Sequence, residues 1–324
     1  MTKEEMLAFM QKSKQKQCNN PDWIVCVPSI TRPNFALGKL LREKCSKEFL
    51  SSHVVIFVRK EELEAYRHCN PEFNYEIVPE EFYGVGYTRD YVNNWAHSHG
   101  KSVVFNWDDD TKNLTFMYEA LDREGYACTH HSNKADYEGS PVFVEEILCS
   151  IAELTFHLFK VFPTLRLGNI RRQRFCGDYS VQKTLAHVNK GALPRQTEIW
   201  KVSDYEIGRY MKPSGRYHGE DITMVANVLQ NKEDLFSIQQ FGYDFVSEQI
   251  SSTVRDPDEN SERNRKLHAH TFESLKQWEI KDYLKISKTY PDGAFMYGDI
   301  DWRKFYVLHP ERKGGAYLME NYNE

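Results

Sequence analysis

The segment Ser102-Val-Val-Phe-Asn-Trp107 is followed directly by Asp108-Asp109-Asp110. A short apolar run with β-branched and aromatic residues predicts a buried strand. Three consecutive aspartates at its end would repel one another and raise each other's pKa unless a cation lay nearby. In an extended chain, Asp108 and Asp110 point to the same side and Asp109 points elsewhere. We therefore expect Asp108 and Asp110 to hold Mg²⁺ or Mn²⁺, which take carboxylates together with phosphate and water oxygens.

The alternative interpretation of the same residues is a solvated acidic loop that binds no metal. In that case Asp110 would cap a helix that begins at Thr111. The strand that precedes the triplet favours the metal site over the loop.

The residues upstream of the triplet alternate between short apolar strands and helical patterns. This alternation predicts an α/β fold with a mostly parallel sheet, right-handed crossovers and flanking helices. In such sheets, ligands bind beyond the carboxyl ends of the strands. The expected strands are Trp23–Pro28, Val54–Val58, Tyr75–Val78 and Ser102–Trp107, and the expected helices are Phe35–Phe49, Glu61–His68 and Thr88–His99.

The second half of the chain has a different pattern, with a long apolar helix at Val142–Phe162 followed by short, basic strands. No internal repeat and no convincing linker interrupts it. The other expected elements are strands at Arg171–Cys176 and Tyr179–Val188, a helix at Ile222–Leu229, two strands within Leu235–Thr253, a polar loop at Asp256–Arg265 and a helix at Leu267–Leu284.

The composition of the 324 residues is that of a globular protein, with 40% hydrophobic and 27% charged residues and a net charge of −5. No apolar run approaches the roughly 18–20 residues that span a bilayer. The first 20 residues are polar, which argues against a secretory signal. Seven widely spaced cysteines without a CxxC pair indicate reduced thiols and a cytoplasmic location, and argue against a disulfide framework or a zinc finger.

A local excess of positive charge stands out against this acidic background. The segment from Lys160 to Arg216 contains twelve Lys and Arg residues and four Asp and Glu residues, so its net charge is +8. The rest of the chain therefore has a net charge of −13. Such a block favours an anionic partner on one face, although an ordinary solvated surface would give the same count.

Two further polar segments lie at expected strand or helix ends. The loop Pro28-Ser-Ile-Thr-Arg-Pro33 contains neither GxGxxG nor GxxxxGK[ST], which argues against a Rossmann dinucleotide site and a P-loop. Gly84 and Gly86 precede a helix whose first turn carries Arg89, an arginine that can reach a phosphate or a nucleobase carbonyl. The alternative is a surface ion pair of Arg89 with Asp90 or Glu81.

The last polar segment is Gly219-Glu220-Asp221 at the start of an apolar helix. Carboxylates are favoured there by the helix dipole, so helix capping is one interpretation. Glu220 or Asp221 could also act as a general base beside the metal. The two roles are compatible.

Taken in order, these motifs resemble GT-A glycosyltransferases. The resemblance covers Trp23 to Asp110 and then Gly219 to Asp221, and Asp90 departs from it because many members have Asn there. Val27-Pro-Ser-Ile-Thr-Arg-Pro33, Gly86-Tyr-Thr-Arg-Asp-Tyr-Val92 and Phe105-Asn-Trp-Asp-Asp-Asp110 are most similar to the TET/JBP-associated glycosyltransferases. That group includes the base J glucosyltransferase and phage enzymes that glycosylate hydroxymethylated pyrimidines in DNA.

The resemblance implies a metal-dependent glycosyltransferase that uses a nucleoside-diphosphate sugar. Asp108 and Asp110 would hold Mn²⁺ or Mg²⁺, and Asp221 or Glu220 would accept the acceptor's proton if the enzyme inverts. A third metal ligand could be His268, His270 or His309, or none of them. The residues implied in nucleotide-sugar binding are Pro28, Ser29, Arg32, Arg89, Trp107, Asp108 and Asp109.

The acceptor implied by the resemblance is DNA with a hydroxymethylated pyrimidine. The basic block would then contact phosphates, and its aromatic residues would stack on a flipped base unless they are core residues. The expected DNA contacts are Arg171, Arg172, Arg174 and Lys183. The alternatives are a protein, glycan or small-molecule acceptor, a nucleotidyltransferase, or an inactive sugar-nucleotide-binding module. A phage enzyme would act in the host cytoplasm.

These inferences also suggest a division of the chain. We expect a polar N-terminal extension (1–20), a catalytic domain (21–254) and a helical C-terminal extension packed on it (255–324). Within the catalytic domain, residues 21–125 would form the nucleotide-sugar half and residues 126–254 the acceptor half.

Overall fold

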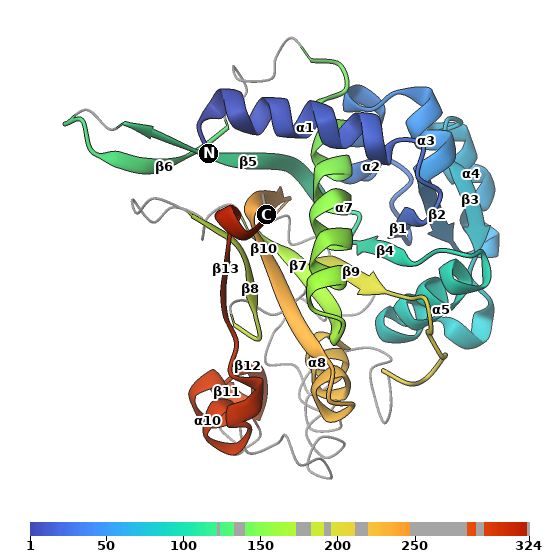
Figure 1. The fold of residues 1–324 in the computed structure, drawn as a ribbon. Helices are drawn as coiled ribbons and strands as arrows, with labels where there is room; N and C mark the ends of the chain where they lie inside the picture. The colour runs from blue at the N-terminus through green and yellow to red at the C-terminus, as the bar shows by residue number, and fades with distance from the viewer. Residues whose placement is uncertain are drawn as a thin grey trace.

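A central β-sheet of eleven strands organises the chain (Figure 1). The computed structural model describes residues 1–121, 124–132, 140–172, 183–190, 196–210, 220–246, 284–289 and 295–322. The main strand order is β13-β8-β10-β7-β9-β4-β1-β2-β3, and β5 and β6 form a hairpin that branches from β10. The strands of this sheet are β1 (Trp23–Pro28), β2 (Val54–Val58), β3 (Asn74–Ile77), β4 (Val103–Trp107), β5 (Thr111–Leu121), β6 (Ala127–His131), β7 (Leu165–Arg172), β8 (Thr184–Val188), β9 (Thr197–Lys201), β10 (Asp234–Phe245) and β13 (Gly315–Leu318).

One half of the sheet is entirely parallel. Strand β1 pairs in parallel with β2 and β4, and β2 pairs in parallel with β3. Every residue of β2 and β4 is buried. This is expected when helices cover both faces of a parallel sheet, because both sets of alternating side chains then face a core.

The other half is mixed. Strand β9 is antiparallel to β4 and β7, β10 runs parallel to β7, and β8 is antiparallel to β10 and β13. Along the main order of described strands, only β8 and β9 therefore oppose the direction of the others. The predicted α/β fold with a mostly parallel sheet is confirmed.

Helices cover the sheet in two layers. Alternate residues of β1 face opposite sides, with Val25 and Val27 in one hydrophobic core and Ile24 and Cys26 in the other. The first core is closed by α1, α2, α3, α4 and α7, and the second by α5, α8 and α10. Their bounds are α1 (Lys3–Gln17), α2 (Ala36–Lys44), α3 (Lys47–His53), α4 (Leu63–Cys69), α5 (Val85–Ser98), α7 (Phe143–Val161), α8 (Glu220–Gln230) and α10 (Trp302–Leu308).

The single helix expected at Phe35–Phe49 is two helices. The backbone of Cys45 is extended and ends α2, and the Ser46 side chain then accepts the Phe49 N–H and caps α3. A serine that can cap a new helix interrupts an otherwise continuous apolar pattern.

Helix α5 begins about one turn earlier than predicted. Its first residue is Val85, preceded by Gly84 at φ 119°, a conformation that favours glycine. Thr88 lies inside the helix and donates its hydroxyl to the carbonyl of Phe82. Thr88 is therefore not the helix cap.

The first 20 residues are not simply a polar extension, because most of them form α1. The helix begins with a capping box between Thr2 and Glu5, and it buries Met6 and Met10 completely. Figure 1 shows α1 lying across α7, and the two helices are in contact. The sequence pattern concealed this because the buried face of α1 continues through two polar residues, Ser13 and Gln17.

The described part of the C-terminal region contains strands that the sequence did not predict. The two strands predicted within Leu235–Thr253 are one long strand, β10, over the described residues. The antiparallel hairpin β11 (Leu284–Thr289) and β12 (Phe295–Ile300) precedes α10, and β13 joins the main sheet. Single-turn helices lie at Lys60–Glu62, Glu80–Phe82, Pro310–Arg312 and Met319–Tyr322. The loop 256–265 and nearly all of the helix predicted at 267–284 lie outside the described residues.

The described helices were also compared with what a membrane requires. None of them combines the length and the apolar character that crossing a bilayer would need.

If α1 is part of the core, truncating one of its buried methionines should destabilise the whole fold. We expect Met10→Ala to lower the free energy of unfolding by about 2–5 kcal/mol, because a buried Met leaves a cavity. Urea denaturation of the full chain measures this. Lys12→Ala, at an exposed position of the same helix, is the matched control and should change stability by less than about 0.5 kcal/mol. Equal stabilities of the two variants would contradict the packing of α1.

Candidate active site

Two polar segments meet at the carboxyl ends of β1 and β4. These strands pair in parallel, with Val25 opposite Phe105, so the loop after Pro28 and the aspartates after Trp107 reach the same edge of the sheet. Ser29 is buried and donates its hydroxyl to Asp109 at 2.6 Å. The sequence segments expected to share a site are therefore in direct contact.

The protein itself compensates the charge of Asp109. One carboxylate oxygen accepts from Ser29, and the other pairs with the Arg32 guanidinium at 2.9 Å. Since the single proton of Ser29 goes to Asp109, the Tyr66 hydroxyl must donate to Ser29, from which it lies 2.8 Å away. Burial raises the pKa of Asp109, and the contacts with Ser29 and Arg32 oppose that rise.

Asp108 is held by a buried arginine. Arg89 on α5 donates to Asp108 at 2.6 Å and to Glu198 on β9 at 2.6 Å. The Arg89 side chain is 4% exposed, whereas the Asp108 side chain is 33% exposed. The surface pair of Arg89 with Asp90 or Glu81, left open by the sequence, is therefore wrong. Asp90 instead accepts from Tyr205 and from the Gly208 N–H.

Asp110 differs from its two neighbours because no cation lies against it in the described part of the chain. Its Oδ2 accepts a long, 3.3 Å hydrogen bond from Gln196. Its Oδ1 is buried and has no hydrogen-bond partner within the described residues. Burial, and then the charges of Asp108 and Asp109, raise the pKa of Asp110 to about 7. Strand β5 starts at Thr111, so Asp110 caps no helix. The alternative interpretation of Asp110 as a helix cap is therefore wrong.

The residues around Asp110 fit a divalent cation. A buried carboxylate oxygen without a donor, with a raised pKa, is what a hard cation would compensate. Within the described ranges, no three His, Cys, Asp or Glu side chains lie so that they could hold a metal ion by themselves. A cation at this edge would therefore need oxygens from a phosphate or from water, as Mg²⁺ usually does.

Of the three histidines considered as a third ligand, only His309 lies among the described residues. His309 follows α10, where its ring lies 3.7 Å from Glu311 and packs on Phe305. It is therefore not a third ligand beside the aspartates in this structure. His268 and His270 lie outside the described residues.

Two other residues predicted to bind the nucleotide sugar differ in exposure. Pro28 ends β1 and is partly exposed. Trp107 is completely buried and stacks on Phe105 with ring centroids 5.6 Å apart. From this position Trp107 supports the end of β4 by packing and cannot stack on a ligand.

Asp221 lies in the first turn of α8. Its carboxylate accepts the backbone N–H of Ile222 at 2.9 Å, which agrees with the helix-end interpretation and leaves the base role open. Helix α8 contacts α5, the helix that carries Arg89. The side chain of Glu220 lies outside the described part of the chain.

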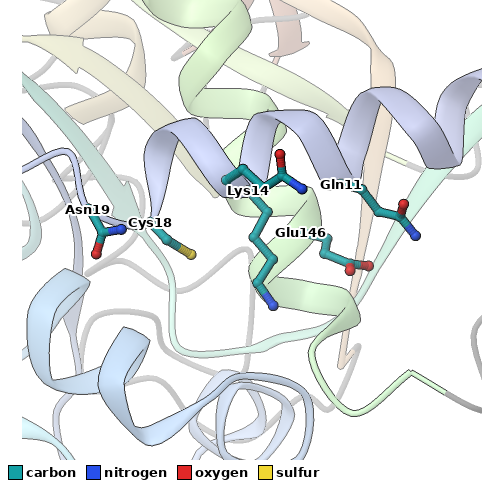
Figure 2. A pocket seen from close by; sticks show the side chains of 6 residues that line it. Gln11, Lys14, Cys18, Asn19 and Glu146 are labelled. Atoms are coloured by element: carbon teal, nitrogen blue, oxygen red, sulfur yellow. The ribbon is translucent and has the colours of Figure 1, made fainter.

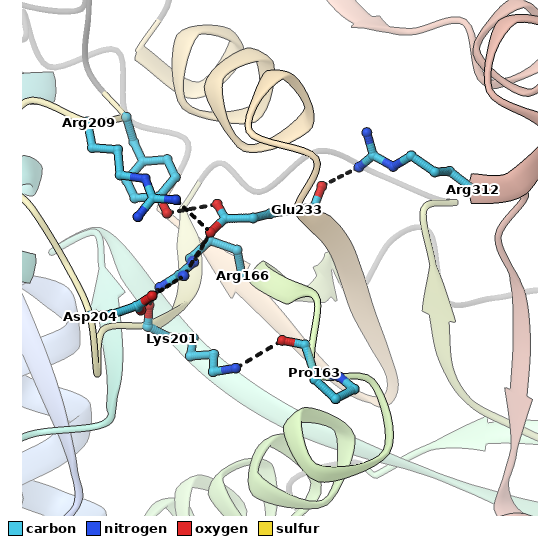
Figure 3. A network of polar contacts seen from close by, with 8 residues as sticks. Pro163, Arg166, Lys201, Asp204, Arg209, Glu233 and Arg312 are labelled. Atoms are coloured by element: carbon cyan, nitrogen blue, oxygen red, sulfur yellow. Dashed lines mark hydrogen bonds and ion pairs between the residues drawn. The ribbon is translucent and has the colours of Figure 1, made fainter.

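Two arginines of the basic block, Arg166 and Arg209, form internal ion pairs (Figure 3). Arg166 is buried and pairs with Asp204 at 2.6 Å and with Glu233 at 2.7 Å. Glu233 also pairs with Arg209 and accepts from Tyr210. These two charges are therefore compensated inside the fold by acids that are distant in sequence.

Three aromatic residues of the basic block are buried in the protein core. Trp200, Tyr205 and Tyr210 are buried and pack on one another in the second core. They are core residues and not stacking platforms. Phe175, Tyr179 and Tyr217 lie outside the described residues.

Arg171 and Arg172 end β7, at the same edge as the aspartates. Arg172 is opposite Tyr243 of β10, and the Tyr243 hydroxyl contacts Gln196, which in turn donates to Asp110. The Arg172 guanidinium lies 3.8 Å from the centroid of the Phe245 ring. Of the other predicted DNA contacts, Lys183 is exposed just before β8, and Arg174 lies outside the described residues.

Residues 23–160 match the family model of the TET-Associated Glycosyltransferase. This range contains the loop after β1, Arg89 and all three aspartates, and it is less than half of the chain. The resemblance to the TET-associated glycosyltransferases inferred from the motifs is confirmed over this range, and with it the predicted enzyme class, a glycosyltransferase.

Comparison with the curated proteins found no match. Among solved structures, glucosyl-3-phosphoglycerate synthase from Mycobacterium tuberculosis in complex with Mn²⁺, uridine diphosphate and glucosyl-3-phosphoglycerate is similar, with a TM-score of 0.45 and 9% identity over 86% of each chain. GalNAc-T7 with UDP, GalNAc and Mn²⁺ has a TM-score of 0.39 and 11% identity over 80% of this chain and 52% of its own. Because these likenesses are distant, no residue role is transferred from them.

Three residues of the site were missed by the sequence analysis. They are Tyr66, which supports the Ser29 loop, Gln196, which contacts Asp110, and Glu198, which pairs with Arg89. Only Glu198 carried a usable signal, as a lone carboxylate within the apolar strand Thr197–Lys201. Tyr66 and Gln196 come from a helix and a loop whose approach to the site depends on the tertiary fold.

A separate hollow lies between the end of α1 and the start of α7 (Figure 2). None of the predicted site residues lines it. Its walls are formed by Gln11, Lys14, Gln15, Cys18, Asn19 and Glu146. The candidate active site is therefore at the sheet edge and not in this hollow.

The raised pKa of Asp110 gives a pH-dependent prediction for the metal-free protein. Because the folded-state pKa of about 7 exceeds the ordinary value of 3.8, ionisation of Asp110 costs stability as pH rises from about 4 to above 7. Asp110→Asn removes this cost. In EDTA, we expect the variant to be more stable than the wild type at about pH 8 and to lose that advantage towards about pH 4. Urea denaturation across this range measures the difference.

Asp109→Asn is the contrasting variant. It weakens bonds from Ser29 and Arg32, so it should destabilise the protein at neutral pH. If Asp110→Asn also destabilises the protein at about pH 8, Asp110 is not the uncompensated carboxylate of the triplet.

Proposed function

We propose that the chain transfers a sugar from a nucleotide sugar to the hydroxymethyl group of a modified pyrimidine in DNA. The proposal rests on one observation: the negative charges of the three aspartates are not equally balanced by positively charged side chains. Asp108 and Asp109 are held by Arg89 and Arg32, whereas Asp110 is buried beside them without a cation. This arrangement is suited to a divalent metal and the diphosphate that accompanies it.

In this proposal Asp110 and Asp108 hold Mn²⁺ or Mg²⁺. When bound, the cation neutralises the charge that develops on the departing diphosphate. The Asp108 carboxylate is partly exposed and can bind the cation, while the buried Arg89 fixes the orientation of that carboxylate. Arg89 is too deeply buried to be the main phosphate contact that its sequence position suggested.

The loop after β1 would bind the nucleotide. The Arg32 side chain is 34% exposed, and Asp109 anchors it at the sheet edge. Thr31 has a positive φ of 60°, unusual for a β-branched residue, and its N–H donates to Glu62. Such strain is retained where surrounding contacts over-determine the backbone, as at ligand sites. Pro28 and Ser29 complete the loop.

The general base would be Asp221 if the reaction inverts the anomeric configuration, with Glu220 as the alternative. Helix α8 brings Asp221 to its first turn, and the contact of α8 with α5 supports an approach to the metal edge. A retaining enzyme would not need a base at this position.

Support for a DNA acceptor comes from the family match and from the position of Arg171 and Arg172. Both arginines end β7, where Arg172 lies opposite Tyr243 of β10. The Tyr243 hydroxyl contacts Gln196, and Gln196 donates to Asp110. An acceptor base would have to leave the helical stack to reach this edge. The smaller basic surface found here also leaves open a protein, glycan or small-molecule acceptor, which is the competing proposal.

The metal role predicts different outcomes for the three aspartates. Asp108→Asn and Asp110→Asn should each lower the transfer rate by at least about 100-fold, since they remove ligands that act on the developing charge. Asp109→Asn should have a milder effect on the rate at saturating substrate. Transfer assays with Mn²⁺, and with EDTA, test this. Unchanged transfer in EDTA would contradict metal dependence.

The DNA role predicts a steep dependence of acceptor binding on salt. Each neutralised phosphate contributes a slope of about −0.9 in a plot of log affinity against log salt. Arg171→Glu and Arg172→Glu should flatten the slope and raise the acceptor KM without changing donor binding. Fluorescence anisotropy at several salt concentrations measures this. Lys12→Glu, an equal charge change on α1, is the control and should leave the slope unchanged.

The acceptor itself can be identified chemically. Hydroxymethylated DNA is incubated with the protein and a panel of nucleotide sugars, and the nucleosides are analysed by mass spectrometry. A nucleoside heavier by one sugar is the expected result. Transfer only to a glycan or a protein would favour the competing acceptor.

A further inference from the structure

A charged chain extends inward from the candidate metal edge. Asp108 is bound to Arg89, and Arg89 is bound to Glu198, with both distances at 2.6 Å. The exposed fraction falls along this chain, from 33% for the Asp108 side chain to 4% for Arg89 and 0% for Glu198. Glu198 also accepts a 2.9 Å hydrogen bond from the Trp200 indole N–H.

Glu198 is placed there by the register of the sheet. On β9 it lies opposite Asn106 of β4, two residues before Asp108, and opposite Asn169 of β7. A carboxylate in the centre of a sheet loses its hydration, so it persists only when it is paired and hydrogen-bonded. Arg89 and the Trp200 N–H meet that need.

The position of Arg89 poses an electrostatic problem for a metal site. A guanidinium 2.6 Å from a carboxylate would cancel the charge that this carboxylate offers to a cation, and it would also repel the cation. Glu198 resolves the problem because it balances Arg89 from the opposite side. The three groups together then carry one net negative charge, which lies at the exposed end on Asp108.

We propose that Glu198 is a positioning residue that balances the charge of Arg89, so that Arg89 orients Asp108 without lowering its affinity for a divalent cation. This inference rests on the proposed metal site at Asp108 and Asp110. The inference adds that the carboxylate of Glu198, which does not contact the metal, influences the metal affinity.

The test measures binding of Mn²⁺ alone to the full chain, by electron paramagnetic resonance of the free ion and by calorimetry. Glu198→Gln keeps the shape and a hydrogen-bond acceptor but removes the charge. We expect it to weaken Mn²⁺ binding by about tenfold or more, since a net positive charge is added close to the site.

The decisive variant is the double substitution Arg89→Gln with Glu198→Gln. It removes both charges and restores the balance, so we expect Mn²⁺ affinity to recover to within about threefold of the wild type, the remaining loss reflecting the orientation that Arg89 gave to Asp108. A purely structural role for Glu198 predicts the opposite, with the double variant at least as impaired as the single one. The double variant removes both members of the buried Arg89–Glu198 pair together, so it tests the proposal even if Glu198→Gln does not fold.

Glu233→Gln is the matched control. Glu233 is another carboxylate of low exposure, which pairs with Arg166 and Arg209 in the network of Figure 3. Its substitution should lower thermal stability and leave Mn²⁺ affinity unchanged. An equal loss of affinity in Glu233→Gln would overturn the proposal, because the effect would then be one of general destabilisation.

The remaining outcomes separate this inference from the proposed function. If Asp110→Asn abolishes Mn²⁺ binding while folded Glu198→Gln binds as the wild type does, the metal site stands and the role of Glu198 is overturned. If Mn²⁺ affinity does not recover in the double variant, the role of Glu198 is likewise overturned and the metal site stands. If the wild type binds Mn²⁺ no better than Asp110→Asn does, both proposals are overturned.

Discussion

Three consecutive carboxylates at the end of a buried strand are the constraint around which the site is built. The chain cannot leave all three charges uncompensated at a sheet edge, and it treats each one differently. Arg89 reaches Asp108 from α5, Arg32 and Ser29 reach Asp109 from the loop after β1, and Asp110 receives only a long hydrogen bond from Gln196. Helix α5, that loop and the segment before β9 each supply one of these contacts.

Most of the first half of the fold could be predicted from the sequence because its signals are local. The apolar runs that become β1, β2 and β4 are short, β-branched or aromatic, and bounded by polar residues. Errors arose where a single capping residue decides the outcome, as with Ser46 and Gly84. The C-terminal region was harder because β13 is defined by its pairing with β8, and such long-range pairing leaves little trace in local periodicity.

The candidate site divides in a similar way. The triplet, Ser29, Arg32 and Arg89 were found because they lie at strand or helix ends, where polar residues in an α/β sequence are conspicuous. Their partners were not predicted, since Glu198 and Gln196 reach the site only through the antiparallel pairing of β9 with β4. The basic block shows the opposite error. Net charge counted along the chain says nothing about internal pairing, and Arg166 and Arg209 are largely neutralised by Glu233.

The position of β13 has a consequence for how the protein reaches this structure. Gly315 pairs with Val188, far away in sequence, whereas β1 to β4 all come from residues 23–107. During synthesis the parallel unit can form early, because its contacts are comparatively local. One side of β8 must wait, with its N–H and C=O groups unpaired, until residues 315–318 have emerged. A nascent chain with such an exposed strand edge is prone to associate with other chains, so yield on expression is expected to depend on chaperones more than the final stability alone would suggest.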